Sequence, residues 1–588
     1  MNLDISKNVF STYGSYMAIS KLPEHYRWQN NSEGVFLRTV RSEACLGPTK
    51  STLVAKLVPT IGGKEAEYQI ETSYTEMYLC TSQGRLSICF ADTETLLIRA
   101  DHPDLGLVIE FVPSEPFFDY LYEIPCEDHM RYEVICFGQN IQYLLWAQDG
   151  KSVMEQKWNG CTADQNKLYF SGDENNLQVV IREIATEWDG ACREYEYDTC
   201  RVKAQKEFEA YCRPIEKICE SEKETAVLAC YTNYSSTVKK SGFLKRDAVY
   251  MSKNWMCSTW SWDHCFNAIA LAYQDPKAAW DQWMIPFDYQ DMSGKIPDNV
   301  NNSKVDWNYV KPPIHGWALR KMMKVMELKA EQLEQAYEKL RAWTLWWINY
   351  RDTDQDGLCE YIHGYDSGWD NATTFAPMPP VESPDLSAYL IIQMDVLEEL
   401  AKKLGRRTDA REWKEKSEAM LQAMLALQFQ EDLPVAIHAG THEVVREDCL
   451  LPYICILLGE KLPQTIRNRM FSVLKSNKFL TSYGMATESP ESSKYEPDGY
   501  WRGPIWPPST LQMIDGISSC GEEGLAKEIA HRYCEMVSHS GFAENYDALT
   551  GEGLRDPAYT WASSVYLTLA YQYYGREEGK NGISDGIK

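Results

Sequence analysis

The hydrophobic pattern of this 588-residue chain changes its period near residue 200. Before that point, short segments rich in β-branched and aromatic residues are separated by Gly, Asp or Pro, which is typical of β-strands. The clearest segments lie at 52–58, 68–72, 86–90 and 106–112. Several short strands at this spacing predict a β-sandwich, and we assign it to residues 1–202.

A charged stretch follows at 203–224, with alternating Lys and Glu and with Pro214, and it predicts a helical linker. Beyond the linker the period becomes helical. We expect about twelve helices, at 225–236, 263–274, 276–288, 314–328, 330–352, 384–405, 409–428, 446–459, 462–475, 505–520, 522–539 and 559–574. Twelve helices predict six antiparallel pairs closed into an (α/α)6 barrel over residues 225–588, so that the fold is mainly α.

Two acidic residues lie on loops of this helical part. Asp370 ends the run Gly-Tyr-Asp-Ser-Gly-Trp-Asp at 364–370, which is too rich in Gly, Asp and Ser for a helix interior. Glu544 lies in a second aromatic-flanked loop, Gly-Phe-Ala-Glu-Asn-Tyr at 541–546. Both loops follow odd-numbered helices, so the barrel topology puts them at the same rim. Two presented carboxyl groups suggest cleavage of a glycosidic bond, which needs one group to protonate the leaving oxygen and another to activate the nucleophile.

Aromatic patches elsewhere in the chain support a carbohydrate site. Residues 255–264 and 500–508 each combine several aromatic side chains with charged residues, Asp263 in the first and Arg502 in the second. Sugar rings present apolar faces and polar rims, so stacking aromatics beside carboxylates and an Arg suit them. Burial of each Trp in a core is the alternative, but it explains the repeated Asp and Arg neighbours less easily.

Composition narrows the partners and the compartment. The net charge of −26 repels nucleic acid and anionic membranes, which leaves a neutral carbohydrate as the expected partner. No run of about 18 apolar residues is present, so we expect no membrane span. The first residues do not read as a signal peptide, so we expect none, and the 18 Cys are scattered without a C-x-x-C pair. We therefore expect a cytoplasmic protein; we also expect it to be of bacterial type and to require no cofactor, and the oligomeric state stays open.

Four motifs carry a family resemblance over roughly residues 250–575. Trp-Ser-Trp-Asp at 260–263, Gly-Trp-Asp-Asn at 368–371, Tyr-Trp-Arg-Gly-Pro-Ile-Trp-Pro at 500–507 and Glu-Asn-Tyr at 544–546, in this order, resemble glycoside hydrolase family 63. These are the processing α-glucosidases and their bacterial relatives; the family 37 trehalases are more distantly similar. The resemblance implies an (α/α)6 catalytic domain after a β-sandwich, and an exo-acting, inverting α-glucosidase that cleaves a small α-glucoside or an oligosaccharide end.

The resemblance also assigns roles. Asp370 would be the general acid and Glu544 the general base, with carboxyls roughly 6.5–9.5 Å apart to admit a water molecule. Burial beside Trp369 should raise the pKa of Asp370. The expected substrate-binding residues are Trp260, Trp262, Asp263, His363, Trp369, Asn371, Trp501, Arg502, Gly503, Trp506 and Tyr546.

A separate motif, Asp-Thr-Asp-Gln-Asp-Gly at 352–357, copies the first half of a calcium loop. Asp352, Asp354 and Asp356 would be ligands, but His363 occupies the position of the bidentate Glu. An ordinary Asp-rich turn and a structural calcium site both remain open.

Three alternatives to the α-glucosidase remain. A trehalase would use the same pair of acids. A glycoside phosphorylase shares this barrel but uses phosphate in place of the catalytic base, so the presence of Glu544 argues against it. From another class, the chain could be a non-catalytic carbohydrate-binding protein, although both acids are retained in their motifs.

Overall fold

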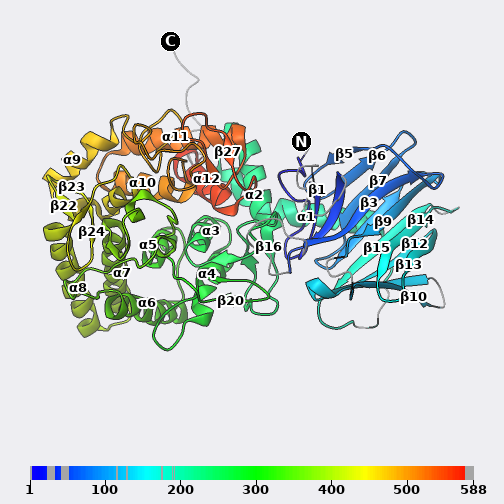
Figure 1. Ribbon diagram of the computed structural model, residues 1–588, viewed down its shortest axis with the longest axis horizontal. Helices are drawn as coiled ribbons and strands as arrows, with labels where there is room; N and C mark the ends of the chain where they lie inside the picture. Colours follow the sequence, from blue (N-terminus) through cyan, green and yellow to red (C-terminus); the bar gives the residue numbers. More distant parts are fainter. Residues whose placement is uncertain are drawn as a thin grey trace, which may run out of the picture.

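The structure is a computed structural model that describes residues 3–22, 33–41, 52–113, 117–126, 130–173, 176–188, 190 and 193–575. The long strands occupy the N-terminal third of the described chain, and the remainder is mainly helical with strands of only two or three residues between the helices. The two parts lie side by side along the longest axis of the molecule (Figure 1).

The strands form two large antiparallel sheets. The seven-stranded sheet has the order β1-β2-β3-β9-β14-β13, with β4 paired to β3. Its strands are β1 (Met17–Leu22), β2 (Gly34–Thr39), β3 (Leu53–Ile61), β4 (Lys64–Glu65), β9 (Leu105–Phe111), β13 (Lys151–Trp158) and β14 (Ala163–Ser171). The eight-stranded sheet has the order β10-β11-β12-β15-β8-β7-β6-β5. Its strands are β5 (Gln69–Thr72), β6 (Met77–Cys80), β7 (Arg85–Phe90), β8 (Thr95–Ala100), β10 (Tyr120–Pro125), β11 (Met130–Cys136), β12 (Ile141–Asp149) and β15 (Leu177–Ile184).

One hydrophobic core joins the sheets. Leu57 and Leu107 from the seven-stranded sheet belong to the same buried cluster as Ile88 and Ile98 from the eight-stranded sheet. All four strand segments expected from the sequence match observed strands, β3, β5, β7 and β9, to within three residues at each end.

The segment expected as a helical linker contains two helices and a break. Helix α1 (Tyr197–Cys212) begins six residues before the expected start of the linker, and the Glu196 side chain accepts the backbone N–H groups of Asp198 and Thr199 as its cap. The 3-10 turns η3 (Arg213–Lys217) and η4 (Glu220–Glu222) then lead into α2 (Lys223–Ser236). Pro214 explains the break, because proline lacks the N–H that an α-helix interior needs.

The helical part follows the predicted periods closely. Its further helices are α3 (Asp263–Ala272), α4 (Pro276–Met284), α5 (His315–Met322), α6 (Ala330–Tyr350), α7 (Pro384–Lys403), α8 (Arg407–Leu427), α9 (Gln464–Leu474), α10 (Pro507–Ser519), α11 (Glu523–Ser540) and α12 (Thr560–Tyr573). The expected α-helix at 446–459 is instead a run of 3-10 turns, η8 (Leu451–Lys461). Pro452 in the first turn and Gly459, whose φ of 55° is left-handed, interrupt the regular α-helical hydrogen bonds there.

Six of these elements form a closed series of contacts. α3 packs on α5, α5 on α7, α7 on η8, η8 on α10, α10 on α12, and α12 again on α3. We call these six the inner elements. Every residue of α3 is buried, whereas α8 buries only one side, as expected for an inner and an outer helix.

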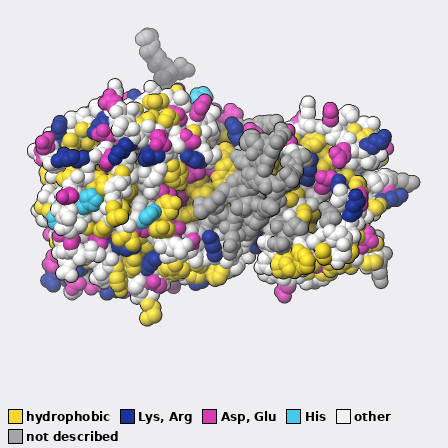
Figure 2. Space-filling model, viewed as in Figure 1, with side chains coloured by type: hydrophobic (Ala, Val, Ile, Leu, Met, Phe, Trp, Pro, Cys, Tyr) yellow, Lys and Arg dark blue, Asp and Glu magenta, His cyan; other side chains and the backbone are white. Residues whose placement is uncertain are grey.

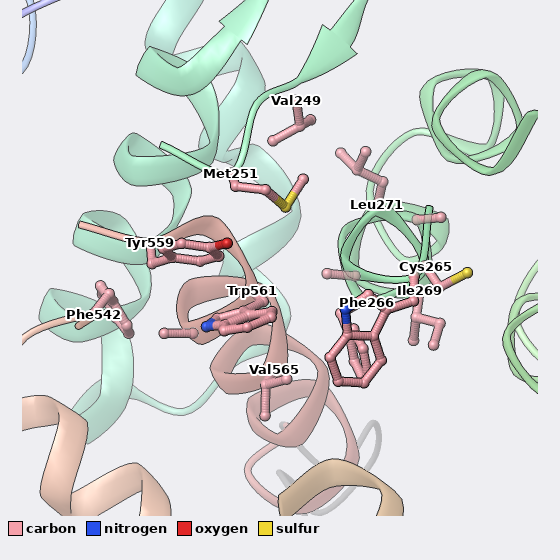
Figure 3. Close-up of a cluster of buried hydrophobic side chains, with 14 of the residues drawn as sticks. Val249, Met251, Cys265, Phe266, Ile269, Leu271, Phe542, Tyr559, Trp561 and Val565 are labelled. Carbon is pink, nitrogen blue, oxygen red and sulfur yellow. The ribbon is translucent and has the colours of Figure 1, made fainter. Parts of the chain in front are cut away.

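The inner elements meet in a continuous hydrophobic cluster. Figure 3 shows Trp561 and Val565 of α12 beside Phe266 and Ile269 of α3, with Tyr559 just before the start of α12.

The visible face of the molecule carries both signs of charge intermixed over the helical part (Figure 2). Among the described helices, none combines the length and the apolar composition that crossing a bilayer requires.

Candidate active site

A cleft of about 250 Å³ opens where several loops precede the inner helices. Asp263 begins α3, the connection at 290–314 precedes α5, Asp370 lies in the loop before α7, and Trp501 lies in the loop before α10. The residues that line the cleft are Met256, Trp260, Trp262, Asp263, Asp298, Asn299, Lys304, Asp306, Asn308, Tyr309, Lys311, Tyr365, Gly368, Asp370, Tyr500, Trp501, Tyr559 and Trp561. The sequence motifs at 260–263, 368–370 and 500–501 therefore do meet in one place.

Lys311 is the buried cation of this cleft. Its Nζ lies 3.5 Å from Oδ1 of Asp298 and 3.8 Å from Oδ1 of Asp370, and it donates a hydrogen bond of 2.9 Å to the carbonyl of Tyr365. Neither of the two aspartate oxygens has a hydrogen-bond partner among the described residues. Buried polar atoms are normally paired, so these oxygens are available to the hydroxyl groups of a ligand.

Burial raises the pKa of the Asp370 carboxyl to about 6, against the lowering effect of Lys311 and with a further raising effect of Asp298. The expected desolvation is therefore present, and the indole of Trp369 beside it is completely buried. Asp366 in the same loop accepts hydrogen bonds from the backbone N–H groups of Val310 and Ile362, so it organises the loop.

Glu544 lies between α11 and α12 and is not one of the residues that line the cleft. Its backbone carbonyl accepts a hydrogen bond of 2.9 Å from the indole of Trp561, which does line the cleft. Burial, then the nearby Asp556 carboxylate, raises the pKa of Glu544 to about 8. Burial raises the pKa of Asp263 to about 7, although its Oδ1 accepts a hydrogen bond from the phenol of Tyr559.

Tyr500 lies within electrostatic range of all three acids. Burial raises the pKa of its phenol well above the ordinary value, and the charges of Glu544, Asp370 and Asp263 act in the same direction. Its φ of 63° is rare for a residue with a side chain and is a strain of the kind that concentrates at functional sites.

The tryptophans form a stack rather than a common lining. Trp260, Trp262 and Trp501 face the cleft. Trp369 and Trp506 lie against Trp501, with ring centroids 4.7 Å and 3.8 Å away, and are buried. Their position supports the Trp501 ring and does not expose them to a ligand.

Three other expected substrate residues hold loops together. Asn371 donates to the carbonyl of Gly499 and accepts the N–H of Trp501, which ties the Asp370 loop to the loop before α10. Gly503 donates its N–H to the Thr487 hydroxyl. Tyr546 pairs with Ile505 through two backbone hydrogen bonds.

Two of the expected substrate-binding residues lie elsewhere. The guanidinium of Arg502 is 2.8 Å from Glu496 and 35% exposed, and Arg502 is not a lining residue. Its guanidinium therefore pairs with Glu496 and does not face the cleft in this structure. His363 is exposed and contacts the rings of Tyr309 and Tyr365 at the rim.

Close packing explains why the loop before α7 needs glycine. A Cβ built on Gly368 would come within 2.6 Å of the Trp262 ring, and the φ of 74° is left-handed. Only glycine allows Trp262 and the Asp370 loop to approach this closely.

Sequence reasoning missed Lys311, Asp298, Tyr500 and Tyr559. For Lys311 and Asp298 the sequence did offer one signal. The connection at 290–314, in which both lie, is long for a loop between helices, and long loops often carry functional residues.

The Asp-rich loop at 352–357 lies outside the cleft. Asp354 and Asp356 form a cluster there with Glu382 and His442 whose potential ligand atoms all lie within 4.8 Å of one another.

Residues 256–562 match the family model for the mannosylglycerate hydrolase MGH1-like glycoside hydrolase domain. Mannosylglycerate hydrolase MGH1 of Selaginella moellendorffii is 22% identical over 410 residues, which cover 53% of this chain and 80% of the relative. Glucosylglycerate hydrolase of Mycolicibacterium hassiacum is 22% identical over 414 residues, covering 52% and 90%.

Solved structures agree on the fold. The GH63 mannosylglycerate hydrolase of Thermus thermophilus in complex with glucose aligns with a TM-score of 0.52 and 19% identity over 58% of this chain and 99% of its own. A bacterial glucoamylase complexed with acarbose aligns with a TM-score of 0.63 and 12% identity over 97% of this chain and 94% of its own, so this likeness extends over both parts of the molecule. Because the family model spans more than half of the chain and includes the cleft motifs, the protein belongs to the MGH1-like glycoside hydrolases of family 63.

Proposed function

We propose that the protein is an exo-acting, inverting glycoside hydrolase for α-linked glucosides, with Asp370 as general acid and Glu544 as general base. The observation that carries the proposal is that Asp370 and Asp263 line one cleft with Trp561, whose indole donates a hydrogen bond to the backbone carbonyl of Glu544. Asp370 would protonate the departing oxygen while Glu544 takes a proton from the attacking water on the opposite face of the sugar.

The pKa values of Asp370 and Glu544 bear on their roles as general acid and general base. Burial raises the pKa of Asp370 to about 6 and that of Glu544 to about 8, so both carboxyls can gain or lose a proton near neutral pH. The catalytically active form carries a proton on Asp370 and none on Glu544. Bound substrate favours that form, because the glycosidic oxygen accepts a hydrogen bond from protonated Asp370 and the water donates one to ionised Glu544.

Asp263 is proposed to hold hydroxyl groups of the cleaved sugar. Asp263 is buried at the start of α3, and its Oδ1 accepts a hydrogen bond from the Tyr559 phenol. Trp262, which directly precedes it in the sequence, lines the cleft. Trp260, which is partly exposed in the cleft, offers an apolar face on which the sugar ring can stack.

We also propose that the helical part is an (α/α)6 barrel. The closed series of contacts among the six inner elements supports this, with α2, α4, α6, α8, α9 and α11 as the outer layer. Each proposed catalytic acid then precedes an inner helix at the same rim.

Charge argues for a neutral substrate. The lining includes four aspartates, Asp263, Asp298, Asp306 and Asp370, and two lysines, Lys304 and Lys311. Both lysines lie within 4.0 Å of an aspartate, so little positive charge is left for an anionic aglycone. The second candidate is a glycoside of glycerate, which the names of the family and of the relatives favour.

A substrate panel separates the two. Glucosylglycerol and glucosylglycerate differ mainly in one carboxylate, and α-linked glucose disaccharides, including trehalose, complete the series. Cleft charge predicts a higher kcat/KM for glucosylglycerol than for glucosylglycerate; the reverse order would establish the glycerate glycoside. Proton NMR of the first product should show β-glucose, since an inverting displacement changes the anomeric configuration.

Glu544→Ala tests the role of the base. The variant should lose hydrolysis, and azide should restore turnover of α-glucosyl fluoride by entering where the carboxylate was, with the β-azide as product. An α-azide or a trapped glucosyl-enzyme would mean that a carboxylate acts as nucleophile, and the inverting assignment would fall.

A further inference from the structure

A carboxylate cluster outside the cleft joins three separate segments. Asp354 and Asp356 come from the loop after α6, Glu382 from β21 (Val381–Glu382), and His442 from the turn after β24 (Ala436–His438). One potential ligand atom from each lies within 4.8 Å of all the others. Asp352 and Glu360 flank the same loop.

Several oxygens of this group have no protein partner. The Glu382 side chain is completely buried, yet neither Oε1 nor Oε2 has a hydrogen-bond partner among the described residues. Oδ1 of Asp352 and Oε1 of Glu360 are likewise buried without a partner. Clustered buried carboxylates without partners are energetically costly unless a cation joins them. The unpartnered oxygens are a feature of the structure and do not depend on the sequence motif.

Glu382 also supplies what the sequence motif lacks. A calcium loop needs a bidentate carboxylate at its twelfth position, and the chain has His363 there. Glu382 lies further along the chain, but β21 brings its carboxylate into the cluster. The loop itself turns as such loops must, with Gln355 at φ 61° and Gly357 at φ 92°.

We propose that Asp354, Asp356 and Glu382, with Asp352 and Glu360 beside them, bind a hard divalent cation of the calcium class. Oxygen donors dominate the set, and such donors suit calcium better than zinc. The one nitrogen donor, Nε2 of His442, lies 3.1 Å from Asp356 and its side chain is 38% exposed, so it is free to turn away when a cation enters.

Such a cation would brace the loop that carries Asp370. The ligands lie on both sides of it, at 352–360 and at Glu382, and two backbone hydrogen bonds between Tyr361 and Val381 close its base. The cation would thus act as a positioning element for Asp370 from outside the cleft.

Calorimetry and thermal melting of the EDTA-treated full-length protein test the proposal with CaCl2, MgCl2 and ZnCl2. We expect one Ca²⁺ per chain and a rise in Tm of about 2 °C at a hundredfold excess over Kd. Hydrogen exchange should show Ca²⁺-dependent protection over residues 351–382.

Glu382→Gln should lose the Ca²⁺-dependent rise while its metal-free Tm equals or exceeds that of the wild type, because one of several like charges is gone. Glu443→Gln, an exposed neighbour of His442, should keep the rise. His442→Ala should also keep it. Absence of Ca²⁺ binding in the wild type, an undiminished rise in Glu382→Gln, or a rise with Zn²⁺ alone that His442→Ala removes would each overturn the calcium-class site.

Discussion

Replacing Lys311 by Met should displace the lower limb of the pH–rate profile. In the wild type, the pKa values of about 6 for Asp370 and about 8 for Glu544 predict a bell-shaped kcat/KM profile with an optimum near pH 7. Lys311 lowers the pKa of Asp370 from a distance of 3.8 Å. Without this cation the pKa of Asp370 should rise, so that the lower limb moves to higher pH and the bell narrows.

The size of the effect follows from the geometry. An opposite charge within about 4–6 Å shifts a carboxyl pKa by about 1–3 units, which corresponds to about 1.4–4 kcal/mol. The pKa of folded Asp370 lies above the value of the unfolded chain, so its contribution to stability is fully present below about pH 4 and is lost as the pH rises through the folded pKa. In Lys311→Met the pKa of Asp370 is higher, so its contribution to stability continues to fall above pH 6. The free energy of unfolding of the variant should therefore fall further below that of the wild type between pH 5 and pH 9.

Two measurements check this, the pH dependence of kcat/KM and the free energy of unfolding by denaturant at pH 5 and pH 9. Lys304→Met is the matched control, because Lys304 lies in the same connection and also lines the cleft, but its side chain is 37% exposed and pairs with Asp306. It should leave the lower limb in place. An unmoved limb in Lys311→Met, together with an equal deficit at both pH values, would refute the electrostatic role of Lys311.

Three further changes have defined outcomes. Asp370→Asn should lower kcat by about 10²–10⁴-fold with little change in Tm, because the amide keeps the shape and loses the transferable proton; kcat within a few-fold of the wild type would contradict the general-acid role. Gly368→Ala should lower both Tm and kcat/KM more than Gly405→Ala does, since both glycines have φ 74° but only the first would press a Cβ into Trp262; equal losses would leave backbone strain as the whole effect. Arg502→Lys should change kcat/KM by less than about tenfold, because the guanidinium is 35% exposed and already paired; a larger loss would restore the substrate contact that the sequence suggested.

The division into a strand-rich and a helical part was predictable because each part keeps one hydrophobic period. Inner helices such as α3 are buried all round and outer helices such as α8 are amphipathic, and both give a helical period. The exception was η8, where Pro452 and Gly459 changed the backbone within an otherwise apolar run. Hydrophobicity alone cannot distinguish 3-10 turns from an α-helix there.

The candidate site was predictable only in part, for a physical reason. Asp370 and Glu544 are flanked by aromatics and glycines, which marks them in the sequence. Lys311 also follows aromatic residues, Trp307 and Tyr309, but its importance arises from burial and from two aspartates that the fold brings to it. Arg502 is the opposite case. Its motif is conspicuous in the sequence, but in the structure its guanidinium forms an ion pair with Glu496.

Asp370 is thus subject to two separable influences, one electrostatic and one mechanical. Lys311 acts on its charge from inside the cleft, while the proposed cation at Glu382 would act on the position of its loop from the far end. If the two are independent, Lys311→Met changes the pH profile and leaves hydrogen exchange at 351–382 unchanged, and Glu382→Gln does the reverse. The double variant should then combine both effects additively, because distant sites without shared partners usually add. Strong non-additivity would instead mean that the loop and the cleft electrostatics change together, and that Asp370 is held by a single coupled arrangement.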